Sequence, residues 1–183
     1  MPTHSASRNR LARSAAIPAP DTVAIRRATL ADLDALVALE QAVFATDHMS
    51  RRSIRRFVTA PRADVLVVEH GGRFAGAAVV LSRTGSDVAR LYSIAIDPAV
   101  AGRGFGPALL AAAEAAAIAR GCRAIRLEVH ETNARAIERY RKAGYREFGR
   151  HVAYYEDQGD ALRFEKPVGA EPVPPSRSSL TSS

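Results

Sequence analysis

A glycine-rich loop between a strand-like run and a helix-like run constrains the fold of this chain more than any other feature. The run VARLYSIAID (88–97) alternates as a strand does, Pro98 ends it, and AGRGFG (101–106) leads to Pro107 and a long alanine-rich stretch. Glycine lets the backbone bend tightly and approach a ligand without a Cβ clash. The free main-chain N–H groups and the dipole of the following helix suit a pyrophosphate group, and Arg103 can add a discrete positive charge.

Two other kinds of phosphate-binding loop do not fit this sequence. A nucleotide-triphosphate P-loop ends in Gly-Lys-Ser or Gly-Lys-Thr, and no such triplet closes the segment 101–107. A dinucleotide-binding fold has its glycines after the first strand, whereas three strand-like runs joined by short turns come before this loop. The loop therefore belongs to another class of pyrophosphate site.

Periodicity and turn residues predict the order β-α-α-β-β-β-α-β-α-β-β. Thr29 and Ser50 are suitable N-caps for the first two helices, and Pro107 for the opening turn of the third. The predicted strands are 22–27, 65–70, 73–82, 88–97, 123–130, 145–152 and 160–166, and the later helices run from 107 to about 120 and over 133–144. The fold class is therefore α/β, with a mixed sheet of about seven strands, about four helices, and parallel pairing only in the middle of an otherwise antiparallel sheet.

Composition indicates one globular domain with a polar segment at each end. The chain has 183 residues, which suits a single domain. An acid-free segment over 1–20 and a Pro- and Ser-rich tail over 169–183 are both expected to be disordered and to flank a folded domain over 21–168. Because Cys122 is the single cysteine and the histidines have no ligand spacing, we expect neither an intrachain disulfide nor a metal site.

The charge of the chain is only weak evidence for a nucleic-acid partner. The formal net charge is +7, and only part of it lies within the folded domain. Such a modest surplus fits an anionic ligand equally well, so we predict no nucleic-acid partner, and the basic helix face over 51–56 is expected to be solvated. No apolar run is long enough to span a bilayer, so no membrane partner is expected.

Three segments resemble one enzyme family. LYSIAIDPAVAGRGFGPALL (91–110) resembles the acetyl-CoA-binding motif of the GNAT N-acetyltransferases, and LEVHETNARAIERYRKAGY (127–145) resembles the segment that completes their site. YYEDQGDALRFEKP (154–167) resembles the C-terminal strand region of the branch that acetylates the N-terminal alanine of ribosomal proteins. The resemblance implies the GNAT fold, acetyl-CoA as co-substrate, no metal, a cytoplasmic enzyme, and a monomer or homodimer.

The resemblance also implies roles for particular residues. The main chain of β-strand residues would bind pantetheine, with the N–H of Ile96 polarising the thioester carbonyl, and the loop backbone would hold the pyrophosphate. Asn133 would hydrogen-bond the pantetheine, Glu128 would be the general base, and Tyr140 the acid for the leaving thiolate. The implied cofactor-binding residues are Ile94, Ala95, Ile96, Gly102, Arg103, Gly104, Phe105, Gly106, Pro107 and Asn133.

The chain departs from the family pattern at two positions of the loop. Ala101 stands where the family usually has Gln or Arg, and Pro107 stands where a basic residue is common. The main-chain donors survive both changes. A side-chain contact with phosphate is expected to be absent, which bears on the affinity for the cofactor and not on the fold.

The residue pattern is compatible with these catalytic roles. Glu128 and His130 alternate with apolar residues on one strand face, and His130 is a rival base. Tyr140 lies two helical turns after Asn133 on one stripe, so both can point along one ligand. Alone, either Glu128 or Tyr140 would be read as structural; their twelve-residue spacing around Asn133 favours the catalytic interpretation.

The acceptor is expected to be a primary amine. An α-amine has a pKa of about 7.7–8.0 and is neutral more often near pH 7.4 than a lysine, so a modest base suits a peptide N-terminus. Tyr154 and Tyr155 can line the groove that binds the acceptor. Four acidic residues near the predicted acceptor end are expected to favour a cationic acceptor: Glu131, Glu156, Asp157 and Asp160. Two alternatives remain, a small-molecule amine acetyltransferase and a non-catalytic acyl-CoA-binding regulatory module.

Overall fold

The computed structural model describes residues 22–44 and 48–169. The predicted arm over 1–20 lies outside these residues, as does the predicted tail after its first residue, Gly169. The strands are β1 (Val23–Arg27), β2 (Ala63–His70), β3 (Arg73–Leu81), β4 (Val88–Ile96), β5 (Ala124–His130), β6 (Arg146–His151) and β7 (Ala161–Pro167). The helices are α1 (Leu33–Val43), α2 (Arg51–Thr59), α3 (Phe105–Ala119) and α4 (Ala134–Lys142), with short 3₁₀ turns η1 (Leu30–Asp32) and η2 (Pro98–Val100).

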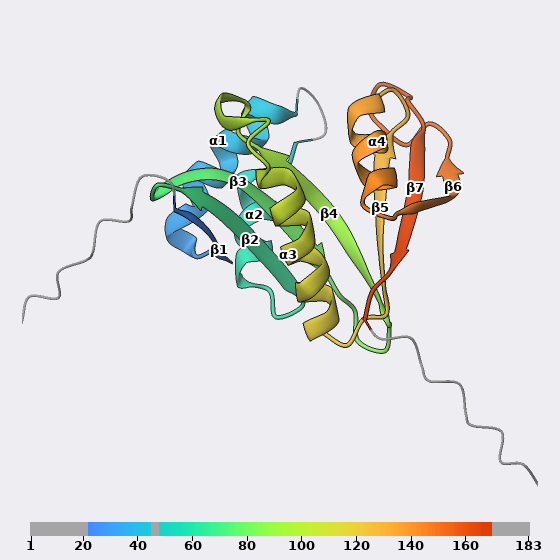
Figure 1. The fold of residues 1–183 in the computed structure, drawn as a ribbon, viewed down its shortest axis with the longest axis horizontal. Coiled ribbons are helices and arrows are strands. Elements are labelled where there is room, and N and C mark those ends of the chain that lie inside the picture. Colours follow the sequence, from blue (N-terminus) through green and yellow to red (C-terminus); the bar gives the residue numbers. More distant parts are fainter. Residues whose placement is uncertain (1–21, 45–47, 170–183) are drawn as a thin grey trace, which may run out of the picture.

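One seven-stranded sheet runs through the molecule in the order β1-β2-β3-β4-β5-β7-β6. Its one parallel pair is β4 with β5, and the other neighbouring strands are antiparallel. This arrangement confirms the predicted fold class and the position of the parallel pair. Figure 1 shows α3 crossing one face of β2, β3 and β4, with α1 and α2 on the other face and α4 beside β5.

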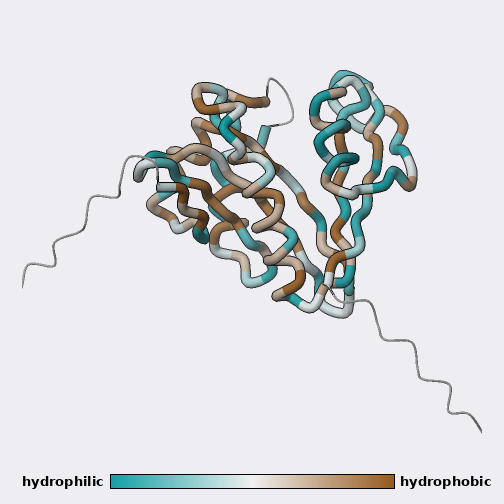
Figure 2. The backbone as a smooth tube through the Cα atoms, viewed as in Figure 1, coloured by the Kyte–Doolittle hydropathy of each residue, from teal (hydrophilic) through white to brown (hydrophobic). Residues whose placement is uncertain are grey.

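Two apolar clusters stabilise the sheet, one on each face. The larger includes Leu109 and Leu110 of α3 and Ile137 and Tyr140 of α4, packed on the strands. The smaller packs α1 and α2 on the opposite face and includes Leu36, Leu39, Ile54 and Phe57. Figure 2 shows the hydrophobic residues gathered along the central strands. Burying one side chain of this size contributes about 1.5–3 kcal/mol of transfer free energy. This burial determines which face of each helix packs against the sheet.

Local capping explains where the first helices begin. Thr29 and Asp32 form a capping box, in which the N–H of Thr29 donates to Oδ2 of Asp32 at 2.7 Å. The hydroxyl of Ser50 accepts from the N–H of Ser53 at 3.2 Å at the start of α2. Both predicted N-caps are confirmed, although η1 separates Thr29 from α1.

The third helix begins earlier than its sequence predicts. The prediction placed its opening turn at Pro107, whereas α3 starts at Phe105. Gly104 has a left-handed backbone (φ 85°) and turns the chain there. Pro107 is therefore the third helical residue, where its missing N–H removes no intrahelical hydrogen bond.

The parallel pair opens into a notch. β4 and β5 are paired only from Val88–Arg90 to Ala124–Arg126, and beyond these residues the two strands separate (Figure 1). A bulge at Tyr92 breaks the register between β3 and β4 at the same level, because Val79 faces Ser93 while Val80 faces Leu91. Tyr92 and Ser93 therefore lie on the same face of the sheet, since the extra residue shifts the alternation. No helix among the described residues is long and apolar enough to cross a membrane.

Candidate active site

A cleft of about 1000 Å³ follows the notch between β4 and β5. Its walls come from both sheet faces and from the loop before α3. The predicted site residues that line it are Ile94, Ala95, Ile96, Gly102, Gly104, Phe105, Gly106, Pro107, Glu128, Asn133, Tyr140, Tyr154 and Tyr155. Arg103 is the predicted site residue that does not line it. The structure therefore brings together residues up to sixty positions apart in the chain.

The main chain of β4 offers hydrogen-bonding groups to the notch. The N–H of Asp97 donates to the carbonyl of Ala75 on β3 at 2.9 Å. Because successive residues of a strand point their main-chain groups to opposite sides, Ala95 also faces β3, and Ile94 and Ile96 face the notch. Of the three predicted pantetheine contacts on β4, the geometry therefore favours Ile94 and Ile96.

The loop before α3 presents the positive end of the helix to the cleft. Gly102 and Gly104 have φ values of 88° and 85°, and no atom lies within 4 Å of a Cβ built on either residue. Glycine is therefore required there by backbone conformation rather than by space. The first N–H groups of α3 have no partner within the helix and are available to an anion.

Arg139 of α4 reaches across the notch to this helix terminus. Its Nη1 lies 3.6 Å from the position that a Cβ on Gly106 would take. No ion pair joins Arg139 to an acid within the described residues, and Arg135, one turn earlier on α4, also lines the cleft. A guanidinium beside the positive end of a helix is unfavourable unless an anion lies between them.

Sequence reasoning assigned this charge to Arg103 and missed Arg139. The sequence offered one signal for Arg139: Arg135 and Arg139 are one helical turn apart on the helix whose N-cap, Asn133, was already predicted to lie in the site. The basic side chains that line this end of the cleft therefore come from α4 rather than from the loop.

Glu128 lies on the sheet face that carries α1 and α2, with its side chain 14% exposed. Nε of Arg90 donates to its Oε2 at 2.9 Å, and Nη2 of Arg90 donates to the hydroxyl of Tyr154 at 2.8 Å. Burial alone would lower the pKa of Arg90, but the neighbouring Glu128 and Tyr154 raise it above its ordinary value. Sequence reasoning did not identify Arg90, because only the fold joins β4 to β5 and to the β6–β7 loop.

Tyr140 approaches the cleft from the opposite face of the sheet. Its ring packs against Tyr145 and Phe164, with centroids 5.7 Å and 6.4 Å away. Burial raises the pKa of Tyr140 to about 12, so its phenol stays protonated at neutral pH. The predicted neighbour on its stripe, Asn133, caps α4, since its Oδ1 accepts from the N–H of Ala136 at 3.1 Å. The amide nitrogen of Asn133 therefore remains as its donor for a ligand.

His130, the rival base, is committed to neighbouring groups. Its Nε2 lies 3.1 Å from Oδ2 of Asp157, and its Nδ1 lies 2.8 Å from the hydroxyl of Thr132. Its ring also packs against Tyr155, with centroids 4.8 Å apart. Because both ring nitrogens have partners, His130 is less suited than Glu128 to accept a proton from a bound amine.

The acidic group expected to favour a cationic acceptor has a different role in the structure. Arg150 pairs with Glu131 at 3.0 Å and with Asp160 at 2.9 Å, and Asp157 accepts from the N–H of Gly159. None of the four acids lines the cleft. Glu131, Asp157 and Asp160 bond main-chain or side-chain groups of the segment from β6 to β7, so their positions do not support the expectation of a negatively charged acceptor mouth.

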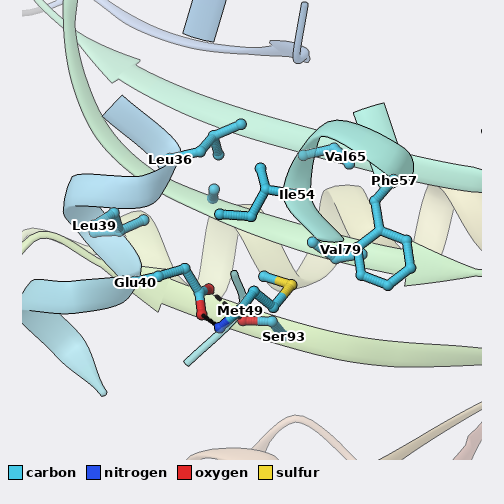
Figure 3. Close-up of a pocket in the computed structure, with 10 residues that line it drawn as sticks. Leu36, Leu39, Glu40, Met49, Ile54, Phe57, Val65, Val79 and Ser93 are labelled. Atoms are coloured by element: carbon cyan, nitrogen blue, oxygen red, sulfur yellow. Dashed lines mark hydrogen bonds between the residues drawn. The ribbon is translucent and has the colours of Figure 1, made fainter. Parts of the chain in front are cut away.

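A buried carboxyl supports the other side of the acceptor mouth. Glu40 of α1 accepts from the N–H of Met49 and from the hydroxyl of Ser93, both at 3.1 Å (Figure 3). Burial raises the pKa of Glu40 above its ordinary value. The carboxyl faces a small apolar cavity under α1 and α2 (Figure 3) and also lines the cleft. Sequence reasoning missed Glu40, although a charged residue four positions after Leu36 on an apolar helix stripe was a usable signal.

The described part of the chain has no set of side chains arranged as metal ligands. Among residues 22–44 and 48–169, no cluster of three His, Cys, Asp or Glu side chains is arranged to hold a metal ion. The cleft is instead lined by main-chain donors, two arginines on α4, and a carboxyl and a phenol on opposite faces.

The comparisons with known proteins agree with this geometry. Residues 31–145 match the model of the acetyltransferase (GNAT) family. The mycothiol acetyltransferase of Clavibacter michiganensis is 34% identical over 75% of this chain, which spans about half (47%) of that relative. N-alpha-acetyltransferase RimI of Mycobacterium tuberculosis is 31% identical over 81% of this chain and 95% of its own.

A solved structure extends the agreement to the whole fold. The crystal structure of the ribosomal-protein-S18-alanine N-acetyltransferase from Escherichia coli superposes with a TM-score of 0.75 and 27% identity. The superposition covers 84% of this chain and 98% of that one. These matches confirm the resemblance, the GNAT fold and the acetyltransferase class that the sequence motifs implied. The chain belongs to the acetyltransferase (GNAT) family.

Proposed function

We propose that this protein transfers acetyl directly from acetyl-CoA to the α-amine of a peptide or protein N-terminus. The observation that carries the proposal is the position of Glu128 and Tyr140, which line one cleft from opposite faces of the sheet. A thioester lying in the notch would have a carboxylate on the acceptor side and a phenol on the other. This arrangement suits removal of a proton from the amine and return of a proton to the sulfur.

The coenzyme would lie along β4 with its pyrophosphate at α3. Main-chain groups of Ile94 and Ile96 face the notch and would pair with pantetheine as an added strand does. The backbone from Gly102 to Pro107 would hold the pyrophosphate, and Arg139 would supply a side-chain charge. The amide nitrogen of Asn133 would donate to the pantetheine. Arg139 thereby compensates for the contacts absent at Ala101 and Pro107.

The chain's own groups then perform the transfer in three steps. The neutral nitrogen of the acceptor attacks the thioester carbonyl, and Glu128 accepts the proton that this nitrogen releases. The N–H of Ile96 faces the notch and would stabilise the oxyanion of the tetrahedral intermediate. The intermediate collapses with cleavage of the carbon–sulfur bond, and Tyr140 donates its phenolic proton to the departing thiolate. Exchange with solvent then removes the proton from Glu128 and restores the proton that Tyr140 gave up. The products are the acetylated amine and the free thiol.

A peptide acceptor is favoured by two observations. The relatives from Mycobacterium tuberculosis and Escherichia coli are named as N-alpha and ribosomal-protein-alanine acetyltransferases. Tyr154 and Tyr155 line the cleft beside Glu128, and Tyr154 is 45% exposed, so an extended segment can contact it. A small-molecule amine is the second candidate, because the mycothiol acetyltransferase is also similar over 75% of this chain. A cytoplasmic location belongs to the same proposal.

Thiol release from acetyl-CoA tests the proposal. The acceptors are peptides that begin with Ala, Ser or Met, the same peptides blocked at the α-amine, free lysine, a polyamine and an aminoglycoside. We expect release with the open peptides and none with the blocked ones. Activity confined to the small amines would contradict the peptide acceptor, and tight coenzyme binding without release for any acceptor would indicate a regulatory module.

A pair of variants separates chemistry from binding. Glu128→Gln removes the base and should lower kcat while leaving the affinity for acetyl-CoA nearly unchanged. Glu165→Gln is the matched control, because Glu165 pairs with Arg126 on the neighbouring strand and does not line the cleft. Equal losses in the two variants would assign Glu128 a structural role.

A further inference from the structure

Arg90 is the last residue of β4 that remains paired to β5, so it lies at the closed end of the notch. Its guanidinium joins two groups on the acceptor face. Nε donates to Oε2 of Glu128 at 2.9 Å, and Nη2 donates to the hydroxyl of Tyr154 at 2.8 Å. One planar group therefore connects β4, β5 and the β6–β7 loop.

This contact is selective among the charged and titratable groups near Glu128. The charged and titratable groups on this side of the sheet include Arg90 of β4, Arg126 and His130 of β5, Arg163 of β7, and Tyr154 and Tyr155 of the β6–β7 loop. Glu40 of α1 lines the same cleft and bonds Met49 and Ser93. Arg126 bonds Glu165 at 2.5 Å, and His130 bonds Asp157. The guanidinium of Arg163 stacks on Phe148, 4.4 Å from the ring centroid. Within the described residues, Arg90 alone donates a hydrogen bond to Glu128.

The contact leaves one oxygen of the carboxylate for the acceptor. Oε2 is held by Arg90, whereas Oε1 has no hydrogen-bond partner within the described part of the chain. The fork of an arginine fixes the plane of the carboxylate, which a point charge cannot do.

Tyr154 extends this arrangement to the acceptor wall. Its hydroxyl bonds Arg90, its ring stacks on His151 at 5.5 Å between centroids, and it meets Tyr155 edge to face at 5.1 Å. The ring is therefore held at a defined distance from Glu128. Tyr154 and Glu128 accept hydrogen bonds from the same guanidinium. A substrate amine that packs against Tyr154 would therefore lie at a fixed position relative to the carboxylate of Glu128.

We propose that Arg90 is a positioning residue for acetyl transfer, which holds the carboxylate of Glu128 with Oε1 toward the acceptor and fixes Tyr154 beside it. The proposal rests on the function proposed above and on Glu128 as its base. Arg90 acts through Glu128 and Tyr154 and touches no reacting atom in this scheme. The acceptor that fits is a neutral α-amine, because a fixed guanidinium beside the base disfavours an acceptor that stays cationic.

The split between kcat and KM for acetyl transfer to an N-terminal peptide is the main test. In Arg90→Gln, we expect kcat to fall about tenfold, because the charged hydrogen bond that orients Glu128 is replaced by a neutral one, while the KM for acetyl-CoA stays unchanged. In Arg90→Lys, the charge remains but the planar fork is lost, so kcat should fall as well. Both variants should keep the affinity of the wild type for acetyl-CoA.

Arg126→Gln is the matched control. Arg126 lies on the same face, pairs with a carboxylate of β7 and lies outside the cleft lining. Its kcat and its KM for acetyl-CoA should coincide with those of the wild type. An unchanged kcat in Arg90→Gln, or an equal fall of kcat in Arg126→Gln, would overturn the role of Arg90 while acetyl transfer by the wild type upholds the proposed function. No transfer by the wild type to any amine would reject the function itself.

A second measurement does not depend on the stability of the Arg90 variants. In the NMR spectrum of the arginine Nε–H groups, Arg90 should give a resonance protected from exchange in the wild type. Glu128→Gln should shift it and speed its exchange, and Glu165→Gln should leave it unchanged. An Arg90 resonance insensitive to Glu128→Gln would overturn the proposal.

Discussion

Removal of the guanidinium of Arg139 should weaken the binding of coenzyme A without affecting pantetheine. The reason is the position of Nη1, 3.6 Å from a Cβ built on Gly106, beside the first N–H groups of α3. These donors and this charge face the same part of the cleft. In the bound state a diphosphate would lie between them, and Arg139→Gln would remove the charge while keeping much of the side-chain length.

The magnitude follows from the kind of contact that is lost. A hydrogen bond to a charged group contributes about 1.5–3 kcal/mol. Since 1.4 kcal/mol corresponds to a tenfold change in Kd, the affinity for coenzyme A should fall about 10- to 100-fold. Arg139 is partly exposed, so solvent and salt screen the charge and the lower end of this range is expected above 0.15 M salt.

Isothermal titration calorimetry with coenzyme A and with pantetheine separates phosphate contacts from the rest of the site. Arg103→Gln and Arg141→Gln are matched controls, because Arg103 does not line the cleft and Arg141 pairs with Glu147 on the other side of α4. Both should bind coenzyme A as the wild type does. The reasoning is refuted if Arg139→Gln loses pantetheine and coenzyme A equally, or if Arg103→Gln loses coenzyme A while Arg139→Gln does not.

Three further predictions follow from the structure. Tyr140→Phe should lower kcat about ten- to a thousandfold with unchanged coenzyme affinity, and an unchanged kcat in thiol release would assign Tyr140 to packing alone. Gly76→Ala should lower the free energy of unfolding by about 1–3 kcal/mol in denaturant titration, because the new Cβ would lie 2.6 Å from a main-chain oxygen of β4. Gly149→Ala is the control, since its Cβ would lie 3.8 Å from the nearest atom, and it should leave the free energy of unfolding nearly unchanged. The hydrogen bond from Arg26 holds the pKa of Asp32 well below its usual range, so the stabilisation that ionised Asp32 gives the fold is complete above about pH 4 and is lost as the pH falls further. Asp32→Asn should therefore lower the free energy of unfolding by about 1 kcal/mol at pH 7. The difference in unfolding free energy between the variant and the wild type should narrow only below about pH 4.

Local signals in the sequence predicted the fold well. Apolar alternation and turn glycines located all seven strands, and the side chains of Thr29 and Ser50 located the starts of two helical segments. The loop 101–106 predicted the one parallel junction, because a strand that leads through glycines into a helix requires a crossover connection. Each of these signals depends on residues within a few positions of one another.

The parts of the site that sequence reasoning missed all depend on distant pairs. Arg90 and Glu128 are 38 positions apart and meet only because β4 and β5 are neighbours. Arg139 reaches the α3 terminus from a different helix, and Glu40 contacts Ser93 across the sheet face. Arg103 has the expected residue type in the expected loop, but its side chain lies outside the cleft lining. Charge in a motif is therefore weaker evidence for a contact than the main-chain geometry of that motif.

The bulge at Tyr92 relates the two ends of the site. Before it, Leu91 faces α3, and after it, Ile94 and Ile96 pack against the cluster on that same face, while Tyr92 and Ser93 together occupy the acceptor face. Without the extra residue the alternation would continue unbroken, and Ser93 would turn away from Glu40. The same insertion therefore sets which main-chain groups face the notch and which side chains line the cleft beside Glu40. Because a one-residue change in register would reverse both, the two halves of the site are coupled through the register of β4.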